Sequence, residues 1–265
     1  MTSYSLGSDD PEIKRLDLQA ASLEAPTRAL LRAGGLRPGM RVLDLGCGLG
    51  HVASIAAEIV GAEGAVVGID NQARMIEVAN SRASANVRFL EGDVRTWRDA
   101  EPFDAIIGRL ILFHLPDAVA VLQHHMEGLK PDGLVLSLDF DLASIRAEPQ
   151  IPTIAKYNEW LLAGFRSVGA NPVLGARLIL LLAEAGLAGV QGAGMQSYLA
   201  PDDPRGPAMF AGVIRSLAPA IVRAGIATEE QLDIDTLADR VGSELKAANA
   251  VILPPVLGAA WGRKR

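Results

Sequence analysis

The stretch Val42 to Gly50, VLDLGCGLG, decides the fold of this chain. An apolar run of strand character leads into three glycines, Gly46, Gly48 and Gly50, and a helical pattern begins at His51. Glycines at such a turn let the backbone approach a ligand closely, and the N–H groups of the following helix point at that ligand. The stretch therefore predicts a ligand-binding unit of strand, loop and helix.

The rest of the chain repeats this alternation of short apolar runs and longer helical patterns, which is typical of βαβ units around a parallel sheet. The expected strands span residues 41–45, 65–69, 87–91, 105–108, 134–139, 190–198 and 256–261. The expected helices span residues 51–60, 72–83, 117–129 and 171–185. We therefore predict an α/β fold with a Rossmann-like, doubly wound seven-stranded sheet.

Three segments, 1–35, 143–170 and 201–250, do not fit the repeating unit and carry helical patterns. Thr228 followed by Gln231 indicates a capping box at the start of a helix. Because ligands bind at the carboxyl ends of strands in open α/β sheets, we expect these segments to cap the site. The alternative is that they only cover sheet edges.

The domain organisation that follows is a single domain over residues 1–265. Its cofactor-binding core is residues 36–142, and residues 171–200 and 251–265 complete the sheet.

Composition restricts the binding partners and the cellular compartment that we expect for the chain. A net charge of −6 argues against binding to nucleic acid, which needs clustered Lys and Arg. The single cysteine, Cys47, excludes an internal disulfide, and we do not expect the acidic beginning of the chain to act as a secretory signal. The apolar run Leu178 to Ala183 is too short for a membrane span. We expect a soluble cytoplasmic protein, and the sequence leaves open whether it forms a homodimer.

Two residues argue against a dinucleotide in the glycine loop. His51 stands where the fingerprint G-x-G-x-x-G has its third glycine. Asp44, two residues before the first glycine, would repel a pyrophosphate in a partly buried site. A ligand with an ammonium group and a sulfonium is favoured instead, and a nicotinamide-dependent oxidoreductase becomes the weaker alternative.

The pattern D-x-G-x-G-x-G from Asp44 to Gly50 resembles the first motif of class I S-adenosylmethionine-dependent methyltransferases. Asp70, at the end of VVGID, resembles the acidic residue that holds the ribose in that family, and Asp93, in EGDV, resembles the one that contacts the adenine amino group. FDAII at 103–107 and LKPDG at 129–133 resemble two further family elements. The resemblance covers about residues 36–142 and implies that the last strand is antiparallel.

The resemblance implies S-adenosylmethionine as the cofactor and S-adenosylhomocysteine as its product. The predicted cofactor-binding residues are Asp44, Gly46, Cys47, Gly48, Asp70, Asn71, Met75, Gly92, Asp93, Val94, Arg109, Tyr4 and Gln19. Tyr4, Arg15 and Gln19 are expected to close over the methionine portion, and His51 either lines the pocket or caps the helix that it begins. A role as a loop or helix-cap residue is the alternative for each of the three aspartates.

The predicted reaction is a direct displacement, in which the enzyme mainly aligns the nucleophile, the methyl carbon and the sulfur. His114, in LFHLPD after the fourth strand, is the candidate catalytic base, with a structural role as the alternative. Arg109 is expected to hold the cofactor's carboxylate or an acidic substrate, or else to pair with Asp139. His124 and His125 are expected to be solvated or at a helix edge.

Missing motifs narrow the acceptor. No N-P-P-Y or D-P-P-Y follows the fourth strand, which disfavours nucleic acid acceptors, and the acidic residue of catechol-type enzymes is absent there, so we expect no metal. The apolar extra segments suit a small, fairly hydrophobic metabolite. An enzyme that binds S-adenosylmethionine but catalyses an elimination or a pericyclic reaction remains the alternative.

Overall fold

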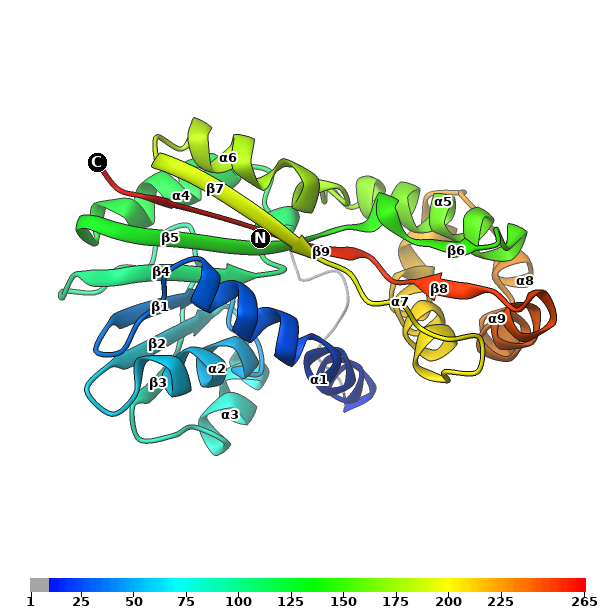
Figure 1. Ribbon diagram of the computed structural model, residues 1–265, viewed down its shortest axis with the longest axis horizontal. Helices are drawn as coiled ribbons and strands as arrows, with labels where there is room; N and C mark the ends of the chain where they lie inside the picture. The colour runs from blue at the N-terminus through cyan, green and yellow to red at the C-terminus, as the bar shows by residue number, and fades with distance from the viewer. Residues whose placement is uncertain (1–9) are drawn as a thin grey trace.

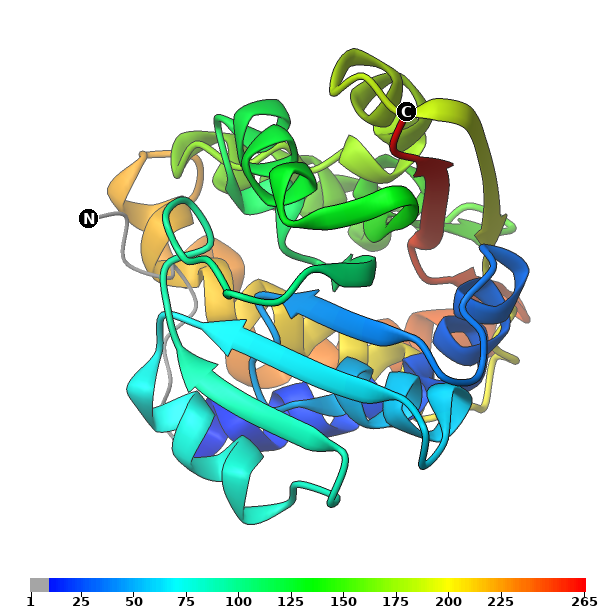
Figure 2. The same cartoon turned by 90° about the vertical axis from the view of Figure 1, so that its left-hand side faces the viewer.

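The computed structural model describes residues 10–265, so the predicted contact of Tyr4 lies outside the described residues. Its main sheet has seven strands in the order β3-β2-β1-β4-β5-β9-β7 (Figures 1 and 2). The strands are β1 Arg41–Leu45, β2 Ala65–Asp70, β3 Val87–Glu91, β4 Phe103–Arg109, β5 Leu129–Asp141, β7 Ala188–Met195 and β9 Val256–Arg263. Strand β9 runs antiparallel to β5 and β7, which confirms the predicted Rossmann-like sheet with its antiparallel last strand.

Helices cover both faces of this sheet because successive side chains of a strand point to opposite faces. Along β4, Ala105 and Ile107 belong to one buried cluster and Ile106 belongs to the other. The first cluster includes side chains of α1 Asp10–Ala33, α2 His51–Val60 and α3 Ala73–Ser81. The second includes side chains of α4 Ala118–Glu127 and α6 Leu178–Glu184.

A layer of helices lies beyond the carboxyl ends of the parallel strands, at the right of Figure 1. It consists of α5 Pro152–Ser167, α7 Arg205–Arg223, α8 Glu229–Leu232 and α9 Ile234–Ala248, together with the two-stranded sheet of β6 Arg146–Glu148 and β8 Val251–Leu253. We call this unit the helical layer. Helices α5 and α7 pack closely, because a Cβ at Gly164 would lie 2.7 Å from Ile221 and 2.8 Å from Leu217. The buried cluster of α4 and α6 continues into this layer.

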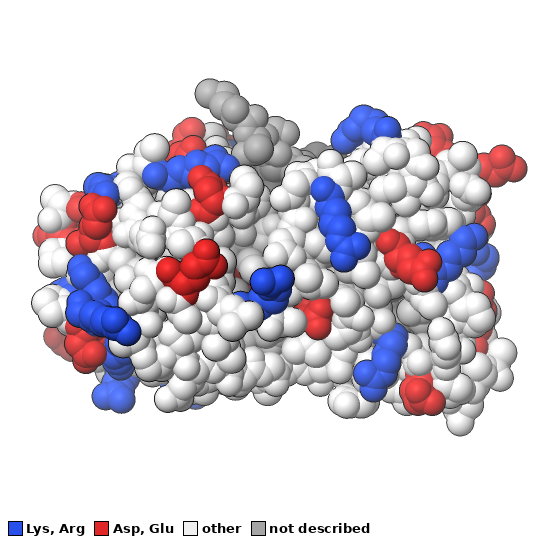
Figure 3. Space-filling view, turned by 90° about the horizontal axis from the view of Figure 1, so that it is seen from above, with Lys and Arg blue, Asp and Glu red and all other residues white. Residues whose placement is uncertain are grey.

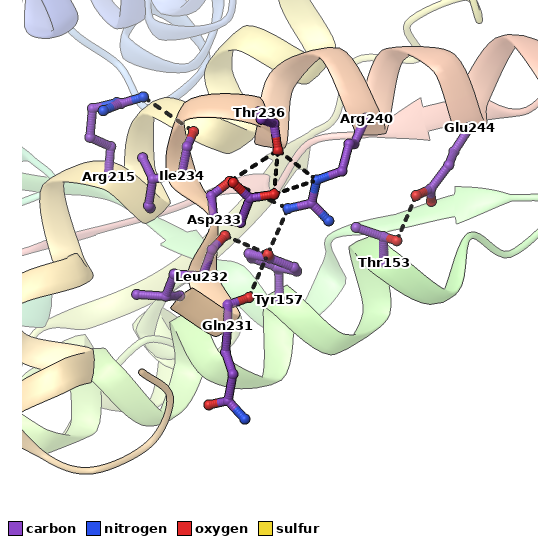
Figure 4. Close-up of polar contacts among 10 residues, drawn as sticks. All are labelled: Thr153, Tyr157, Arg215, Gln231, Leu232, Asp233, Ile234, Thr236, Arg240 and Glu244. Carbon is purple, nitrogen blue, oxygen red and sulfur yellow. Dashed lines mark hydrogen bonds and ion pairs between the residues drawn. The ribbon is translucent and has the colours of Figure 1, made fainter. Parts of the chain in front are cut away.

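Polar contacts of Tyr157 join the helices of the layer (Figure 4). The Tyr157 hydroxyl lies 2.5 Å from the carbonyl oxygen of Leu232 at the end of α8, and Arg240 of α9 donates a hydrogen bond of 2.9 Å to the same hydroxyl. Thr153 of α5 donates to Glu244 of α9 at 2.8 Å. These contacts hold α8 and α9 against α5. Helix α7 packs against both α5 and α9.

Several element boundaries differ from the sequence-based prediction. The predicted helix 171–185 is interrupted, since Leu174–Arg177 form a 3-10 turn before α6 begins. A Cβ at Gly175 would lie 2.4 Å from the carbonyl oxygen of Asp139, so this turn packs directly on the backbone of β5. The short strands β6 and β8 were not predicted. The capping box of Thr228 and Gln231 is confirmed at the start of α8.

The prediction that His125 is solvated or at a helix edge is wrong. Its side chain is buried, and Nε2 lies 2.7 Å from the carbonyl oxygen of Val94. The buried face of α4 consists of Ala118, Val121, Leu122 and His125, so His125 points into the core together with these apolar residues. His124 does lie partly exposed, with Arg98 Nη2 3.0 Å from its Nδ1.

Candidate active site

A cavity of about 790 Å³ lies at the carboxyl ends of β1, β2 and β4, bounded by α1 and α7. Its volume falls in the range of about 300–1,000 Å³ that is typical of small-molecule pockets. One end is walled by loops that leave the sheet, and the other is walled mainly by apolar side chains of the helical layer. The cavity therefore has a polar end and an apolar end.

The glycine loop after β1 forms the floor of the polar end. Gly46, Gly48 and Gly50 all have left-handed backbone angles, with φ of 63°, 50° and 82°. A Cβ at Gly46 would lie 2.6 Å from Ile111, and one at Gly50 would lie 2.5 Å from the Phe89 ring. A Cβ at Gly48 would have no described atom within 4 Å. Two of the glycines therefore allow packing, and Gly48 leaves space in the cavity wall for a ligand.

Asp70, at the end of β2, holds this loop in place. Its Oδ2 accepts a hydrogen bond from the Gly48 N–H at 2.9 Å, and its Oδ1 accepts one from the Gln72 N–H at 2.9 Å. Burial raises the pKa of Asp70, while these backbone N–H groups favour its charged form. Asp70 lines the cavity, so a charged acceptor faces the ligand beside the glycine loop.

The remaining predicted residues of the polar end divide into two groups. Those that line the cavity are Gly46, Cys47, Gly48, Asn71, Met75, Asp93, Val94, Arg109 and Gln19. Gly92 lies behind the wall, where its N–H donates to the Asp70 carbonyl oxygen at 2.9 Å. Burial raises the pKa of the Cys47 thiol, so Cys47 is a wall residue with little thiolate character.

Asp44 lies beneath the cavity. It is 1% exposed, and neither carboxylate oxygen has a hydrogen-bond partner among the described residues. Burial raises the pKa of Asp44 to about 7, and the positive charge of Arg109 opposes this rise. Asp44 therefore lies behind the cavity wall and interacts with the cavity residue Arg109 electrostatically.

Arg109, at the end of β4, does line the cavity. Its Nη1 donates a hydrogen bond of 2.7 Å to Oγ1 of Thr27 in α1. Burial lowers the pKa of Arg109 to about 10, and the Asp44 carboxylate opposes this shift. Within residues 10–265, no ion pair joins Arg109 to Asp139, which was the alternative partner. Asp139 is fully buried away from the cavity, and its neighbour Phe140 lines the cavity instead.

Helix α1 forms one wall through Arg15, Gln19 and their neighbours. Arg15 pairs with Glu12 at 2.6 Å. His51, the first residue of α2, also lines the cavity, and its Nε2 lies 2.8 Å from Oδ1 of Asp17 in α1. Burial lowers the pKa of His51 while Asp17 raises it. The wall of α1 is thus tied to the loop region by polar contacts.

The apolar end begins at His114, which follows β4. Its ring centroid lies 3.8 Å from that of Phe113, and burial lowers its pKa to about 4, so the imidazole is neutral at neutral pH. Apolar side chains that continue this wall are Phe140, Leu142, Ile145, Phe165, Met209, Phe210, Val213 and Ile252. None of the predicted site residues belongs to α7. The apolar periodicity of Arg205–Arg223 predicts an amphipathic helix and could have indicated this wall.

Residues 10–265 contain no group of three or more His, Cys, Asp or Glu side chains placed to hold a metal ion. No helix in that part of the chain is long and apolar enough to cross a membrane. Acidic and basic side chains are interspersed on the face shown in Figure 3.

The fold and the cavity define a Rossmann-like ligand-binding domain, and comparisons with known proteins narrow the class. Residues 36–169, half of the chain, match the family model described as a methyltransferase domain. Trans-aconitate 2-methyltransferase of Rhizobium leguminosarum bv. trifolii is 34% identical over 110 residues, which cover 42% of this chain and 42% of that protein. The chain thus spans less than half the length of this relative.

Solved structures share the fold. The YcgJ protein from Bacillus subtilis aligns with a TM-score of 0.56 at 20% identity, covering 91% of this chain and 100% of that one. Phosphoethanolamine N-methyltransferase 2 of Haemonchus contortus, solved with S-adenosylhomocysteine, aligns with a TM-score of 0.55 at 19% identity, covering 91% and 52%. The chain belongs to the class I S-adenosylmethionine-dependent methyltransferases, as the sequence resemblance predicted. S-adenosylmethionine is the cofactor of this family.

Proposed function

We propose that this protein transfers the methyl group of S-adenosylmethionine to a small acceptor whose body is largely apolar. The observation that carries the proposal is the division of one cavity into a polar end beside the glycine loop and an apolar end under the helical layer. A methyl transfer needs both ligands side by side in one cavity, because the reaction depends on holding the acceptor in line with the carbon–sulfur bond.

The polar end fits each part of the cofactor. The Asp70 carboxylate lines the cavity beside Gly48, where it can accept hydrogen bonds from the two ribose hydroxyls. Asp93 also lines the cavity, and its carboxylate can accept a hydrogen bond from the adenine amino group. The amino-acid portion carries an ammonium and a carboxylate, and the Arg109 guanidinium in the cavity wall can pair with that carboxylate. When bound, the cofactor supplies an electrophilic methyl group on a positively charged sulfur.

The apolar end suits the acceptor. Phe165 and Phe210 are nearly buried side chains in its wall, and they exclude water from an acceptor bound there. His114 is the residue that we assign to the acceptor, because it lines the cavity where the apolar wall begins and a ring nitrogen can accept a hydrogen bond, and then the proton, from an O–H or N–H acceptor. The acceptor atom then forms a bond to the methyl carbon, the carbon–sulfur bond breaks, and S-adenosylhomocysteine leaves.

The test is to incubate the protein with S-adenosylmethionine deuterated in its methyl group and with fractions of small apolar metabolites. Mass spectrometry should find an acceptor that has gained the deuterated methyl group, together with S-adenosylhomocysteine. The variant His114→Gln should lower kcat and leave the affinity for S-adenosylhomocysteine unchanged. A product formed without the label would contradict methyl transfer and support a non-methylating reaction at the same site.

A further inference from the structure

The hydroxyl of Thr27 is completely buried, although α1 otherwise meets the sheet through apolar side chains. Thr27 is 0% exposed, and its Oγ1 accepts the hydrogen bond of 2.7 Å from Nη1 of Arg109. Leu30 and Leu31, one turn further along α1, are also buried against the sheet. The Thr27 hydroxyl therefore sits at a fixed point of the fold, next to a charged group of the cavity.

Arg109 is a partly buried cation that makes few polar contacts. A guanidinium carries five N–H donors, and the contact with Thr27 is its one hydrogen bond among the residues that the structure describes. No carboxylate in that part of the chain lies within 4.0 Å of Arg109, and Asp44 acts on it from further away. Closing the cavity over a ligand removes water from this charge, which is costly unless the ligand supplies the missing partner. Because Arg109 lines the cavity, the partner that fits is an anionic group of the bound ligand.

We propose that Thr27 is a positioning residue that orients the Arg109 guanidinium to receive the carboxylate of the cofactor. The proposal rests on the cofactor binding described under the proposed function. A guanidinium binds a carboxylate best in the plane of its paired N–H groups. The orientation of the guanidinium plane therefore affects how strongly it binds the carboxylate. The bond to Thr27 fixes one N–H and thereby the direction of the others.

This contact also links two parts of the chain that are 82 residues apart in sequence. Arg109 belongs to β4, and Thr27 belongs to the helix whose earlier residues Arg15 and Gln19 form a wall of the cavity. The placement of α1 and the capture of the cofactor's carboxylate are therefore coupled through one hydrogen bond.

The experiment compares two ligands in calorimetric titrations: S-adenosylhomocysteine, and 5′-methylthioadenosine, which lacks the amino-acid portion. Thr27→Val removes the hydroxyl and keeps the branched shape, so it should weaken S-adenosylhomocysteine by about 10- to 100-fold, the range for a hydrogen bond to a charged group. It should leave the affinity for 5′-methylthioadenosine within about twofold of the original value, since that ligand has no carboxylate for Arg109. Thr27→Ser, which keeps the hydroxyl, should restore S-adenosylhomocysteine binding.

Two results would overturn the proposal: equal losses for both ligands in Thr27→Val, which indicate a general structural role, or no loss for either. Arg109→Gln provides a second test of the same link, because it too should weaken S-adenosylhomocysteine selectively, and an equal loss of both ligands in that variant would also overturn the proposal. If the unaltered protein binds neither ligand, the proposed function itself fails, which is a different outcome from unchanged binding in the variants.

Discussion

Replacing Gly48 by alanine separates the cost of backbone strain from the cost of obstructing the cavity. Gly48 has a φ of 50°, and a Cβ there would meet no described atom within 4 Å. The left-handed conformation costs a residue with a Cβ about 1–2 kcal/mol. Gly48→Ala should therefore lower the free energy of unfolding by about 1–2 kcal/mol and leave the fold intact.

Gly39 offers a matched control. It has a φ of 80°, a Cβ there would also meet no described atom within 4 Å, and it does not line the cavity. Gly39→Ala should lower the free energy of unfolding by a similar amount, about 1–2 kcal/mol. Only Gly48→Ala places a methyl group where the cofactor approaches the backbone, and overpacking of this kind costs about 1–3 kcal/mol. That cost corresponds to a Kd about 5- to 150-fold higher.

The assay is urea unfolding of both variants, followed by calorimetric titration with S-adenosylhomocysteine. We expect similar stabilities and a selective loss of binding in Gly48→Ala. If Gly48→Ala binds S-adenosylhomocysteine as tightly as Gly39→Ala does, then the open space at Gly48 is not where the cofactor lies, and the assignment of the polar end is refuted.

Three further predictions concern other parts of the molecule. Burial raises the pKa of Asp139 well above its usual value, with the backbone N–H groups of Phe113 and Leu112 opposing the rise. The folded state therefore holds a proton that the unfolded state releases near pH 4, and stability falls as pH rises from there towards the folded pKa, by about 1.4 kcal/mol for each unit of the shift. Asp139→Asn should raise the Tm at pH 7 and flatten the pH dependence in thermal melts, and a lower Tm at every pH would contradict this. Phe210→Ala should raise the KM for the acceptor and lower the free energy of unfolding by about 3–5 kcal/mol, while the Kd of S-adenosylhomocysteine, measured where the variant is folded, stays unchanged. Tyr157→Phe removes the hydroxyl that meets Leu232 and Arg240, and urea unfolding should show a loss of about 1–3 kcal/mol, whereas an unchanged midpoint would mean that this contact does not stabilise the helical layer.

The sheet was predictable because its signals are local. Residues Arg41–Leu45 form β1 with the predicted bounds, since an apolar run that ends at a glycine turn determines both the strand and its end. The left-handed glycines Gly46, Gly48 and Gly50 were predictable from this same stretch, and Asp70 was predictable as the end of the next strand. Strands β6 and β8 were missed because each has three residues and forms by pairing with a segment about a hundred residues away.

Side-chain partners were less predictable than strands. Arg109 was predicted to lie at the cavity with Asp139 as an alternative partner, whereas its hydrogen bond goes to Thr27 of α1. Helix α4 illustrates the same limit, because a rotation of its buried face by about one residue moves His125 inward and Met126 partly outward. Such facing depends on what packs against the helix, and the sequence of one helix does not contain that information.

The most direct test of the central claim is a calorimetric titration of S-adenosylhomocysteine into the protein and into Asp70→Asn. Asp70 accepts backbone hydrogen bonds from Gly48 and Gln72 and lines the polar end of the cavity, so its charge supports both the loop and the ribose. We predict one saturable site in the original protein and binding at least about 10-fold weaker in the variant, because the charge is lost and an NH2 donor replaces one of the two acceptor oxygens. An equal Kd for the two proteins, or no binding of S-adenosylhomocysteine to the original protein, would contradict the assignment of this cavity as the cofactor site.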